Sequence, residues 1–444
     1  MRVVTFIHTR VYPLLRSVNA SRIIRQLALI LIVALAFANK EAFVAQSEPQ
    51  PVPLPGNSAG LSTSGNNGLS GSNSQNNTDG DLKIPSSDPK SCVTYKDPIQ
   101  LAFFYNPPDG TGAGTMANNF DTYVYTRNFE SAVDDLVNRG EYPVLQYLKF
   151  DDIHDPCFQA KKAQGTACSC SQSPNNNNVG WNKTDVCTIR DEHPDWFLRD
   201  KDGKLIYYED HVMMDPGNQG WRDFWLARVK ISQPEAKWSG VFIDNLATDF
   251  GAHHADTDIV LQKYTDDQYR AAVTGFHKFV YENYFQPNNK RYLGNIAVYW
   301  KEDQVWYDYA QYMDGGQDEF WALTRDGYYS YKSWKAQFQR WEETINTDNR
   351  AILVTQGSKG NNTRQLFGLA SYLLLAGPKV YYRYASDEYY GQPWMYDNYK
   401  SPLGNPTGPY FINKNSNNQS VYIRKFENGK VKVTPAAHKA KIKV

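Results

Sequence analysis

The sequence predicts an α/β protein built as a (β/α)₈ TIM barrel with a small C-terminal β appendage, and three observations favour that class. From about Asp97 onward, short apolar runs with β-branched or aromatic bias recur along the chain. Helical patterns lie between most of these runs, and such alternation indicates a parallel sheet. Eight runs, without a glycine-rich phosphate loop after the first, favour a closed barrel over an open doubly wound sheet, which is the alternative.

Each apolar run is bounded by polar or turn-forming residues, as expected for a buried strand. The eight predicted strands are Ile99–Tyr105, Pro143–Lys149, Val212–Asp215, Val241–Asn245, Tyr292–Ala297, Gln311–Gly315, Ala351–Thr355 and Lys379–Tyr384. After the eighth, two further runs flank Glu427-Asn428-Gly429, which predicts a C-terminal β hairpin.

Three helices can be predicted from their caps and apolar faces. Asn128 can cap a helix that begins at Phe129 and ends at Gly140, and Thr265 can cap a second helix with apolar residues on one face. A third segment, residues 366–375, is apolar on nearly every side and is expected to be buried.

The N-terminal segment indicates targeting. Five arginines between Arg2 and Arg25 precede an apolar stretch of about a dozen residues, 27–38, with small residues at its end. This pattern is typical of a secretory signal peptide. An uncleaved membrane anchor is the alternative, although the stretch is shorter than the roughly 20 residues of a spanning helix. We expect a secreted or extracytoplasmic protein, with a membrane tether through the N-terminus as the second interpretation.

Composition divides the chain into four parts. Residues 1–46 form the signal peptide or anchor, and residues 47–94 are rich in Pro, Gly, Ser and Asn and are expected to form a flexible linker. Residues 95–415 are predicted to form the barrel and residues 416–444 the hairpin. The oligomeric state is left open.

The overall composition excludes some partners. Lys and Arg together number 47, as do Asp and Glu, so the formal charge is zero and the basic footprint of a general nucleic-acid binder is absent. Aromatic residues make up 14% of the chain. Flat aromatic faces suit sugar rings, although they also fill large cores.

Four cysteines cluster in one segment, at positions 157, 168, 170 and 187. In an oxidising compartment, two disulfides within this segment are the simplest interpretation. A zinc site is the alternative, but the segment lacks histidines at zinc-binding spacing, so no metal is expected.

Acidic and polar residues gather at the predicted strand ends, where the functional residues of such barrels lie. The clearest case is Asp244, which follows an apolar strand directly. Two strands later comes Asp314-Gly-Gly-Gln-Asp318-Glu319. Two carboxylates on opposite walls of a pocket are what glycoside hydrolysis requires, so Asp244 and Glu319 are the predicted catalytic pair. Asp314 and Asp318 compete with Glu319 for the role of acid, and capping of a helix or loop is the structural alternative for each. Residues expected to bind substrate are Tyr105, Asp151, Asp215, Asn245, Asn295, Asp314, Asp318, Arg383 and Tyr384.

Four motifs in order resemble a known family. They are His193-Pro-Asp-Trp-Phe-Leu-Arg-Asp, Met214-Asp-Pro-Gly-Asn, Trp221-Arg-Asp-Phe-Trp and Gly240-Val-Phe-Ile-Asp-Asn. Their order and spacing are similar to glycosyl hydrolases of the hypothetical family 15 type, relatives in pattern of the endo-α-1,4-polygalactosaminidase and α-galactosidase barrels. The resemblance implies a (β/α)₈ glycoside hydrolase, with Asp244 on the fourth strand as nucleophile and Glu319 after the sixth as acid/base.

We therefore expect an O-glycosyl hydrolase that cleaves a polysaccharide or glycan and needs no cofactor. The alternative is a catalytically inactive barrel that binds carbohydrate or acts as a surface scaffold. The sugar, the linkage and the anomeric outcome are not encoded in any motif.

Overall fold

The computed structural model describes residues 98–155, 157, 179–180, 185–247, 250, 259–297, 303–386 and 389–444. The predicted signal peptide, the linker and most of the cysteine-rich segment lie outside the described residues. Cys157 and Cys187 are buried, while Cys168 and Cys170 are outside the described part, so the two disulfides stay a prediction. None of the helices in the described part of the chain is long and apolar enough to cross a membrane.

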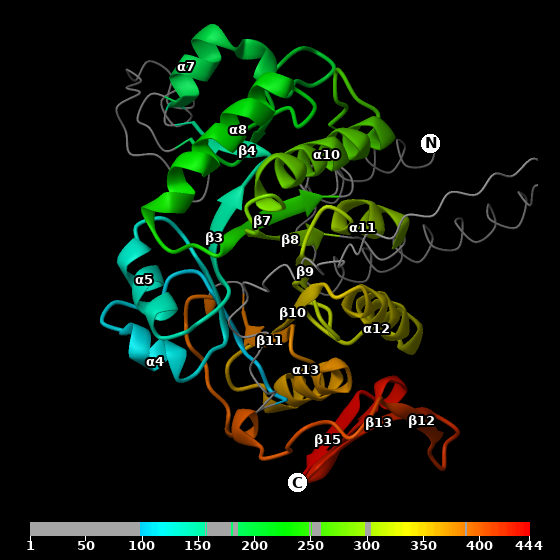
Figure 1. Ribbon diagram of the computed structural model, residues 1–444. Helices are drawn as coiled ribbons and strands as arrows, with labels where there is room; N and C mark the ends of the chain where they lie inside the picture. The colour runs from blue at the N-terminus through cyan, green and yellow to red at the C-terminus, as the bar shows by residue number, and fades with distance from the viewer. Residues whose placement is uncertain are drawn as a thin grey trace, which may run out of the picture. The chain divides into compact units, whose positions relative to one another are not determined.

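Eight parallel strands form the central sheet, as predicted (Figure 1). In sheet order they are β1 (Ala102–Phe104), β2 (Thr122–Tyr125), β3 (Val144–Lys149), β7 (Gly240–Ala247), β8 (Arg291–Ala297), β9 (Gly315–Asp318), β10 (Arg350–Gln356) and β11 (Val380–Ala385). The last strand returns to the first, because Leu101 pairs with Tyr382 and the Tyr382 amide donates to the Gln100 carbonyl at 2.8 Å. The sheet is thereby closed into a barrel.

Two of the predicted strands were wrong in place, and one barrel strand was missed. The second barrel strand is β2, whose four residues TYVY were not predicted. Val212 instead belongs to β6 (His211–Met213), which forms a small antiparallel sheet with β4 (Asp152–His154) and β5 (Tyr207–Tyr208). A short buried apolar run has the same sequence pattern in the barrel sheet and in the small antiparallel sheet, so periodicity does not tell which sheet the strand joins. The sixth strand begins at Gly315, where its prediction ended, because α11 (Asp303–Ala310) and a turn take up the residues before it.

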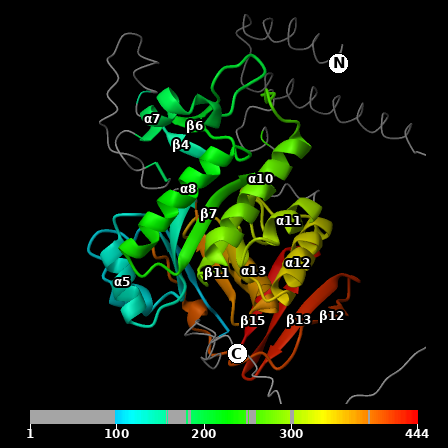
Figure 2. The same ribbon diagram turned by 45° about the horizontal axis from the view of Figure 1, so that its top comes forward.

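Helices alternate with the strands and cover the outside of the barrel (Figure 2). Besides α11 they are α4 (Ala113–Ala117), α5 (Glu130–Asn138), α7 (Asp185–Glu192), α8 (Gln219–Ser232), α10 (Asp266–Val280), α12 (Tyr331–Asn346) and α13 (Asn362–Leu375). A π-helical turn, Tyr281–Phe285, extends α10, and short 3₁₀ turns are Pro194–Trp196, Gln233–Glu235, Asp397–Lys400 and Pro435–Ala437.

The caps match the sequence prediction at one helix and differ at another. Thr265 and Gln268 form a full capping box at the start of α10, so two backbone donors are satisfied. Phe129, not Asn128, is the N-cap of α5. Asn128 has a left-handed backbone with φ 74°, a conformation that asparagine tolerates, and its amide bonds to the Glu130 side chain.

The C-terminal residues form a complete small sheet that packs on α13 (Figure 1). Its strands are β12 (Phe411–Lys414), β13 (Ser420–Phe426), β14 (Gly429–Thr434) and β15 (Lys439–Lys443), all antiparallel. The predicted hairpin is β13–β14. The appendage is larger than predicted, and it starts before residue 416 because β12 pairs with β13. Helix α13 lies between this sheet and the barrel, which explains why it is apolar on most sides.

Alternation along each strand separates two cores. Side chains such as Phe104, Leu145, Phe242 and Leu293 fill the barrel interior. Their chain neighbours pack between the barrel and its helices. Because side chains alternate with a period of two, the residue two positions after each interior side chain also faces inward, one layer nearer the carboxyl ends of the strands. The candidate site occupies that layer.

Candidate functional site

Two carboxylates face each other across the carboxyl-terminal end of the barrel, which we call the barrel mouth. Asp244 lies on β7 and Glu319 directly follows β9. Asn295, on the strand between them, donates from its Nδ2 atom to Asp244 Oδ1 at 2.9 Å and to Glu319 Oε2 at 3.2 Å. Since one nitrogen contacts both oxygens, the two oxygens are no farther apart than the sum of those distances.

Tyr147 holds the Asp244 carboxylate from the opposite side. It lies on β3, and its hydroxyl donates to Asp244 Oδ2 at 2.5 Å. Burial raises the pKa of Tyr147 well above its ordinary value, and the nearby Asp244 carboxylate raises it further. The tyrosine is therefore a hydrogen-bond donor at any physiological pH.

Glu319 has a matching pair of donors. The Tyr390 hydroxyl donates to its Oε1 atom at 3.1 Å, and Gln356 Nε2 donates to the same atom at 3.3 Å. Gln356 also contacts the Tyr390 hydroxyl at 3.2 Å. Burial, followed by the charge of Glu319, raises the pKa of Tyr390 well above its ordinary value. Each carboxylate is thus oriented by one tyrosine hydroxyl, and the Asn295 side-chain amide contacts both carboxylates. The Gln356 side-chain amide adds a further donor to Glu319.

The backbone at the barrel mouth is irregular where the site lies. Asn245 has φ 62°, its amide donates to Asp244 Oδ1 at 2.9 Å, and the pairing of β7 with β8 shifts between Ile243 and Leu246. This bulge re-aims the end of β7. Tyr105 also has φ 62°, which is unusual for a bulky residue, and its ring lies 5.2 Å from that of Tyr147 and 5.7 Å from that of Tyr390. Strained backbone of this kind clusters at functional sites.

Asp151 lies in a buried charged group beside the pair. Lys149 is in register with Asp244 and forms an ion pair with Asp152 at 2.7 Å. Burial alone would lower the pKa of Lys149, but the neighbouring carboxylates together raise it above its ordinary value. Burial, then the charge of Asp152, raises the pKa of Asp151. Its Oδ1 atom is buried and has no hydrogen-bond partner among the described residues.

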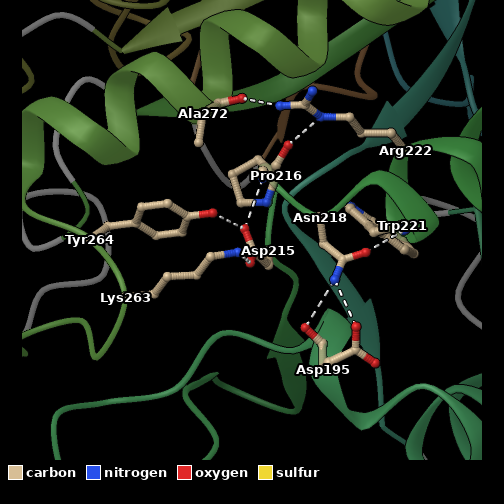
Figure 3. Close-up of polar contacts among 10 residues, drawn as sticks. Asp195, Asp215, Pro216, Asn218, Trp221, Arg222, Lys263, Tyr264 and Ala272 are labelled. Atoms are coloured by element: carbon tan, nitrogen blue, oxygen red, sulfur yellow. Dashed lines mark hydrogen bonds and ion pairs between the residues drawn. The ribbon is translucent and has the colours of Figure 1, made fainter.

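The Asp215 side chain forms hydrogen bonds and an ion pair with loop residues (Figure 3). Its Oδ1 atom accepts from the Gly217 amide at 2.8 Å and the Tyr264 hydroxyl at 2.6 Å, and its Oδ2 atom pairs with Lys263 at 2.7 Å. The bond from the Gly217 amide closes an Asx turn in the Asp-Pro-Gly-Asn segment. Its contacts fasten the segment before α10 to the loop before α8.

The side chains of the other two acids near Glu319 do not face into the barrel mouth. Asp314 precedes β9, accepts from the Tyr292 amide at 2.9 Å and lies 3.7 Å from Arg291, at the amino-terminal end of the barrel. Its predicted role at the mouth is therefore wrong. Asp318 is the last residue of β9, and its side chain points out of the barrel toward α12. There Trp341 and Gln337 each donate to its Oδ2 atom at 2.8 Å. Both side chains are therefore engaged in contacts that stabilise the fold, and neither faces the site of the pair.

Arg383 and Tyr384 support loops instead of lining the pocket. Buried Arg383 donates to the backbone carbonyls of Tyr390, at 3.1 Å, and Gln392, so it holds the loop that presents Tyr390. Tyr384 packs between the barrel and its helices and donates to the Ser358 carbonyl at 3.0 Å. The predicted substrate contact through Tyr384 is wrong, because alternation along β11 turns this side chain outward.

Three residues at the site were not predicted: Tyr147, Gln356 and Tyr390. Period-two alternation would have found Tyr147, which lies two positions after the interior Leu145, and Gln356 ends the seventh strand. Tyr390 comes from the loop after β11, and no sequence pattern places it.

Among the described residues, no group of three or more His, Cys, Asp or Glu side chains is placed to hold a metal ion.

A sequence model of hypothetical glycosyl hydrolase family 15 matches residues 167–430. No curated protein matches significantly. Similar solved structures include the glycoside hydrolase domain of PelA from Pseudomonas aeruginosa, 11% identical over 65% of this chain and 94% of that chain, with a TM-score of 0.42. Another is the maltogenic α-amylase AmyB from Thermotoga neapolitana. It is 10% identical over 76% of this chain and 85% of that chain, with a TM-score of 0.44.

Proposed function

Because the chain belongs to hypothetical glycosyl hydrolase family 15, we propose that it is a retaining glycoside hydrolase in which Asp244 is the nucleophile and Glu319 the acid/base. The proposed substrate is a polysaccharide or glycan, and no cofactor is required for the chemistry.

The observation that carries the proposal is the shared hydrogen bond of Asn295. It holds one oxygen of each carboxyl group, at 2.9 Å and 3.2 Å from the same nitrogen, so the nearest oxygens of the pair lie close together. Retaining enzymes, whose carboxyl groups are about 5–5.5 Å apart, need no room for a water behind the sugar. The spacing therefore supports direct attack by one of the carboxylates.

In the first step, protonated Glu319 gives its proton to the glycosidic oxygen while the Asp244 carboxylate attacks the anomeric carbon. The bond from that carbon to the leaving oxygen breaks, and a glycosyl ester with Asp244 forms. In the second step, ionised Glu319 takes a proton from water, the water oxygen attacks the anomeric carbon and the ester bond breaks. The sugar leaves with its original anomeric configuration, and both carboxyl groups return to their starting protonation.

The roles follow from position. Asp244 accepts from Tyr147, Asn295 and its neighbouring amide, and this set of donors orients its carboxylate for attack. Glu319 lies two strands away, with Oε2 toward Asn295 and Oε1 toward Tyr390, so one oxygen faces the nucleophile and the other faces away from it. Tyr105 and the buried Asp151 are the proposed contacts to substrate hydroxyls nearest to the pair.

Release of reducing ends from a panel of polysaccharides tests the function. Wild-type chain is compared with its Asp244→Asn and Glu319→Gln variants, and Asp318→Asn is the matched control because it removes an acid next to Glu319 that faces α12. We expect release by wild type and by the control, and loss in both site variants. Release that survives Glu319→Gln but not Asp318→Asn would move the acid to Asp318. No release by wild type, with sugar binding that survives both substitutions, would leave a carbohydrate-binding barrel.

The anomeric outcome tests the mechanism separately. ¹H NMR of the first product formed should show the configuration of the substrate, before mutarotation equilibrates it. An inverted first product would contradict the assignment of Asp244 as a nucleophile while leaving the hydrolase function intact.

Export of the protein is a second part of the proposal, and it rests on the N-terminal sequence alone. Mass spectrometry of the N-terminus of the protein made by its host should show a start close to Ala38. An N-terminus that retains residues 1–38 would favour the membrane anchor.

A further inference from the structure

A pocket of about 780 Å³ opens beside the catalytic pair, above the ends of β10 and β11. Its lining includes Gln356, Ser358, Lys359, Tyr389, Gln392 and Trp394. This volume is within the range of roughly 300–1,000 Å³ that is usual for small-ligand sites. The proposed chemistry does not use any of these side chains except Gln356.

The pocket contains an exposed aromatic ring. Tyr389 is 49% exposed, and among the described residues only Phe411 joins it as an exposed aromatic side chain. Beneath Tyr389 lies Trp394, with ring centroids 6.0 Å apart and the ring planes tilted by 33°. Trp394 is itself buried and packs against Tyr384. The exposed ring is therefore supported from behind by a fixed aromatic layer, an arrangement suited to stacking on the apolar face of a sugar ring.

The pocket lies on the Glu319 side of the catalytic pair. Gln356, which lines it, donates to Glu319 Oε1, whereas the other carboxylate oxygen, Oε2, bonds to the Asn295 amide that also holds Asp244. In the order of the sheet, Glu319 stands between β7, which carries the nucleophile, and β10 and β11, whose loops supply most of the pocket lining; Arg325 adds to it from the loop after β9.

In the proposed reaction, the acid/base protonates the oxygen that joins the cleaved sugar to its leaving group. The leaving group consequently lies on the acid/base side of the bond, away from the nucleophile. From this geometry we infer that the pocket is the leaving-group subsite, and that it binds a sugar residue whose ring stacks on Tyr389 while Ser358 and Gln392 offer hydrogen bonds to its hydroxyls. The inference rests on the proposed function.

The test compares two substrates that differ only in their leaving group. The first is an oligosaccharide of the polysaccharide that the wild-type chain cleaves, and the second is the glycosyl fluoride of the same sugar, whose leaving group cannot reach the pocket. The variants are Tyr389→Ala, Tyr389→Phe, which keeps the ring, and Phe411→Ala, which removes the comparable exposed ring from β12. Since Tyr389 is half exposed, its substitution should leave the fold intact, which a thermal melt checks.

For Tyr389→Ala we expect kcat/KM to fall about tenfold on the oligosaccharide and to change less than twofold on the fluoride. Tyr389→Phe and Phe411→Ala should resemble wild type on both. An equal loss on both substrates, or no loss on either, would overturn the inference while the hydrolase function stands.

Cleavage of neither substrate by wild type would instead refute the proposed function. The pocket is then tested by NMR titration with cello-, malto- and chito-oligosaccharides. Binding that Tyr389→Ala alone weakens would support a sugar site at this ring, and binding that is equal in all four proteins, or absent from wild type, would overturn it.

Discussion

The hydrogen bond between Tyr147 and Asp244 allows a prediction about the catalytic rate. Tyr147→Phe removes the hydroxyl but keeps the ring, which packs against Tyr105 and Phe242, so the barrel should be undisturbed. The lost bond is short, 2.5 Å, and its acceptor is charged in the form that attacks the sugar. Hydrogen bonds to charged groups contribute about 1.5–3 kcal/mol to stability.

The size of the effect follows from that energy. Without the hydroxyl, the Asp244 carboxylate is held only by Asn295 and the Asn245 amide, so it should be less well placed for attack. At about 1.4 kcal/mol per tenfold change in rate, kcat/KM should fall about ten- to a hundredfold.

The matched variant is Tyr390→Phe, which makes the same change at the other carboxylate. Its hydroxyl lies 3.1 Å from Glu319 Oε1. This bond is longer and Gln356 also donates to Oε1, so its loss should cost less, about three- to tenfold in kcat/KM. The assay is kcat/KM of wild type and both variants on the substrate found by reducing-end release. No loss in either variant, or a larger loss in Tyr390→Phe than in Tyr147→Phe, would refute this reasoning.

Three further predictions concern residues around the pair. Asp314→Asn should keep kcat/KM within twofold of wild type, because this side chain lies at the far end of the barrel, and a loss above tenfold would contradict that placement. Asn245→Ala should be about 1 kcal/mol less stable to denaturant than Asn245→Gly, since only the former strains the left-handed backbone, and equal stabilities would mean that the bulge relaxes. Burial lowers the pKa of His277 from its ordinary value of 6.5 to about 3. At pH values between these two, the histidine binds a proton in the unfolded chain but not in the folded chain, so stability falls as the pH falls. Wild type should therefore lose up to about 1.4 kcal/mol of unfolding free energy per pH unit between pH 6 and 5 relative to His277→Gln, and parallel stability curves would contradict a neutral buried histidine.

Much of the fold and the central pair could be predicted from local patterns. Apolar runs bounded by polar residues indicated a closed parallel barrel, because a strand buried on both faces must be apolar throughout. Asp244 was found for the same reason, since an acid that ends such a run stands at the edge of the buried layer. Asn295 and Tyr105 were predicted from the ends of their strands, and the structure brings both close to the pair.

Local patterns failed where a side chain depends on register or on a distant loop. Glu319, Asp318 and Asp314 all lie within six residues, yet only the Glu319 side chain faces into the barrel mouth. A shift of one residue along a strand turns a side chain from the interior to the helices, as for Asp318, and the true start of β9 at Gly315 moves Asp314 to the opposite end.

The sequence by itself determined the class of fold, the order of its strands from the fourth onward and the acidic character of their ends. These features depend on the polarity of residues that are neighbours in the chain. Tertiary structure alone decided which acids meet and what surrounds them. Tyr147, Asn295, Gln356 and Tyr390 converge from four different parts of the chain, and closure of the barrel brings them to one pair of carboxylates. Contacts between residues so far apart in sequence depend on barrel closure and strand register, which no local pattern records.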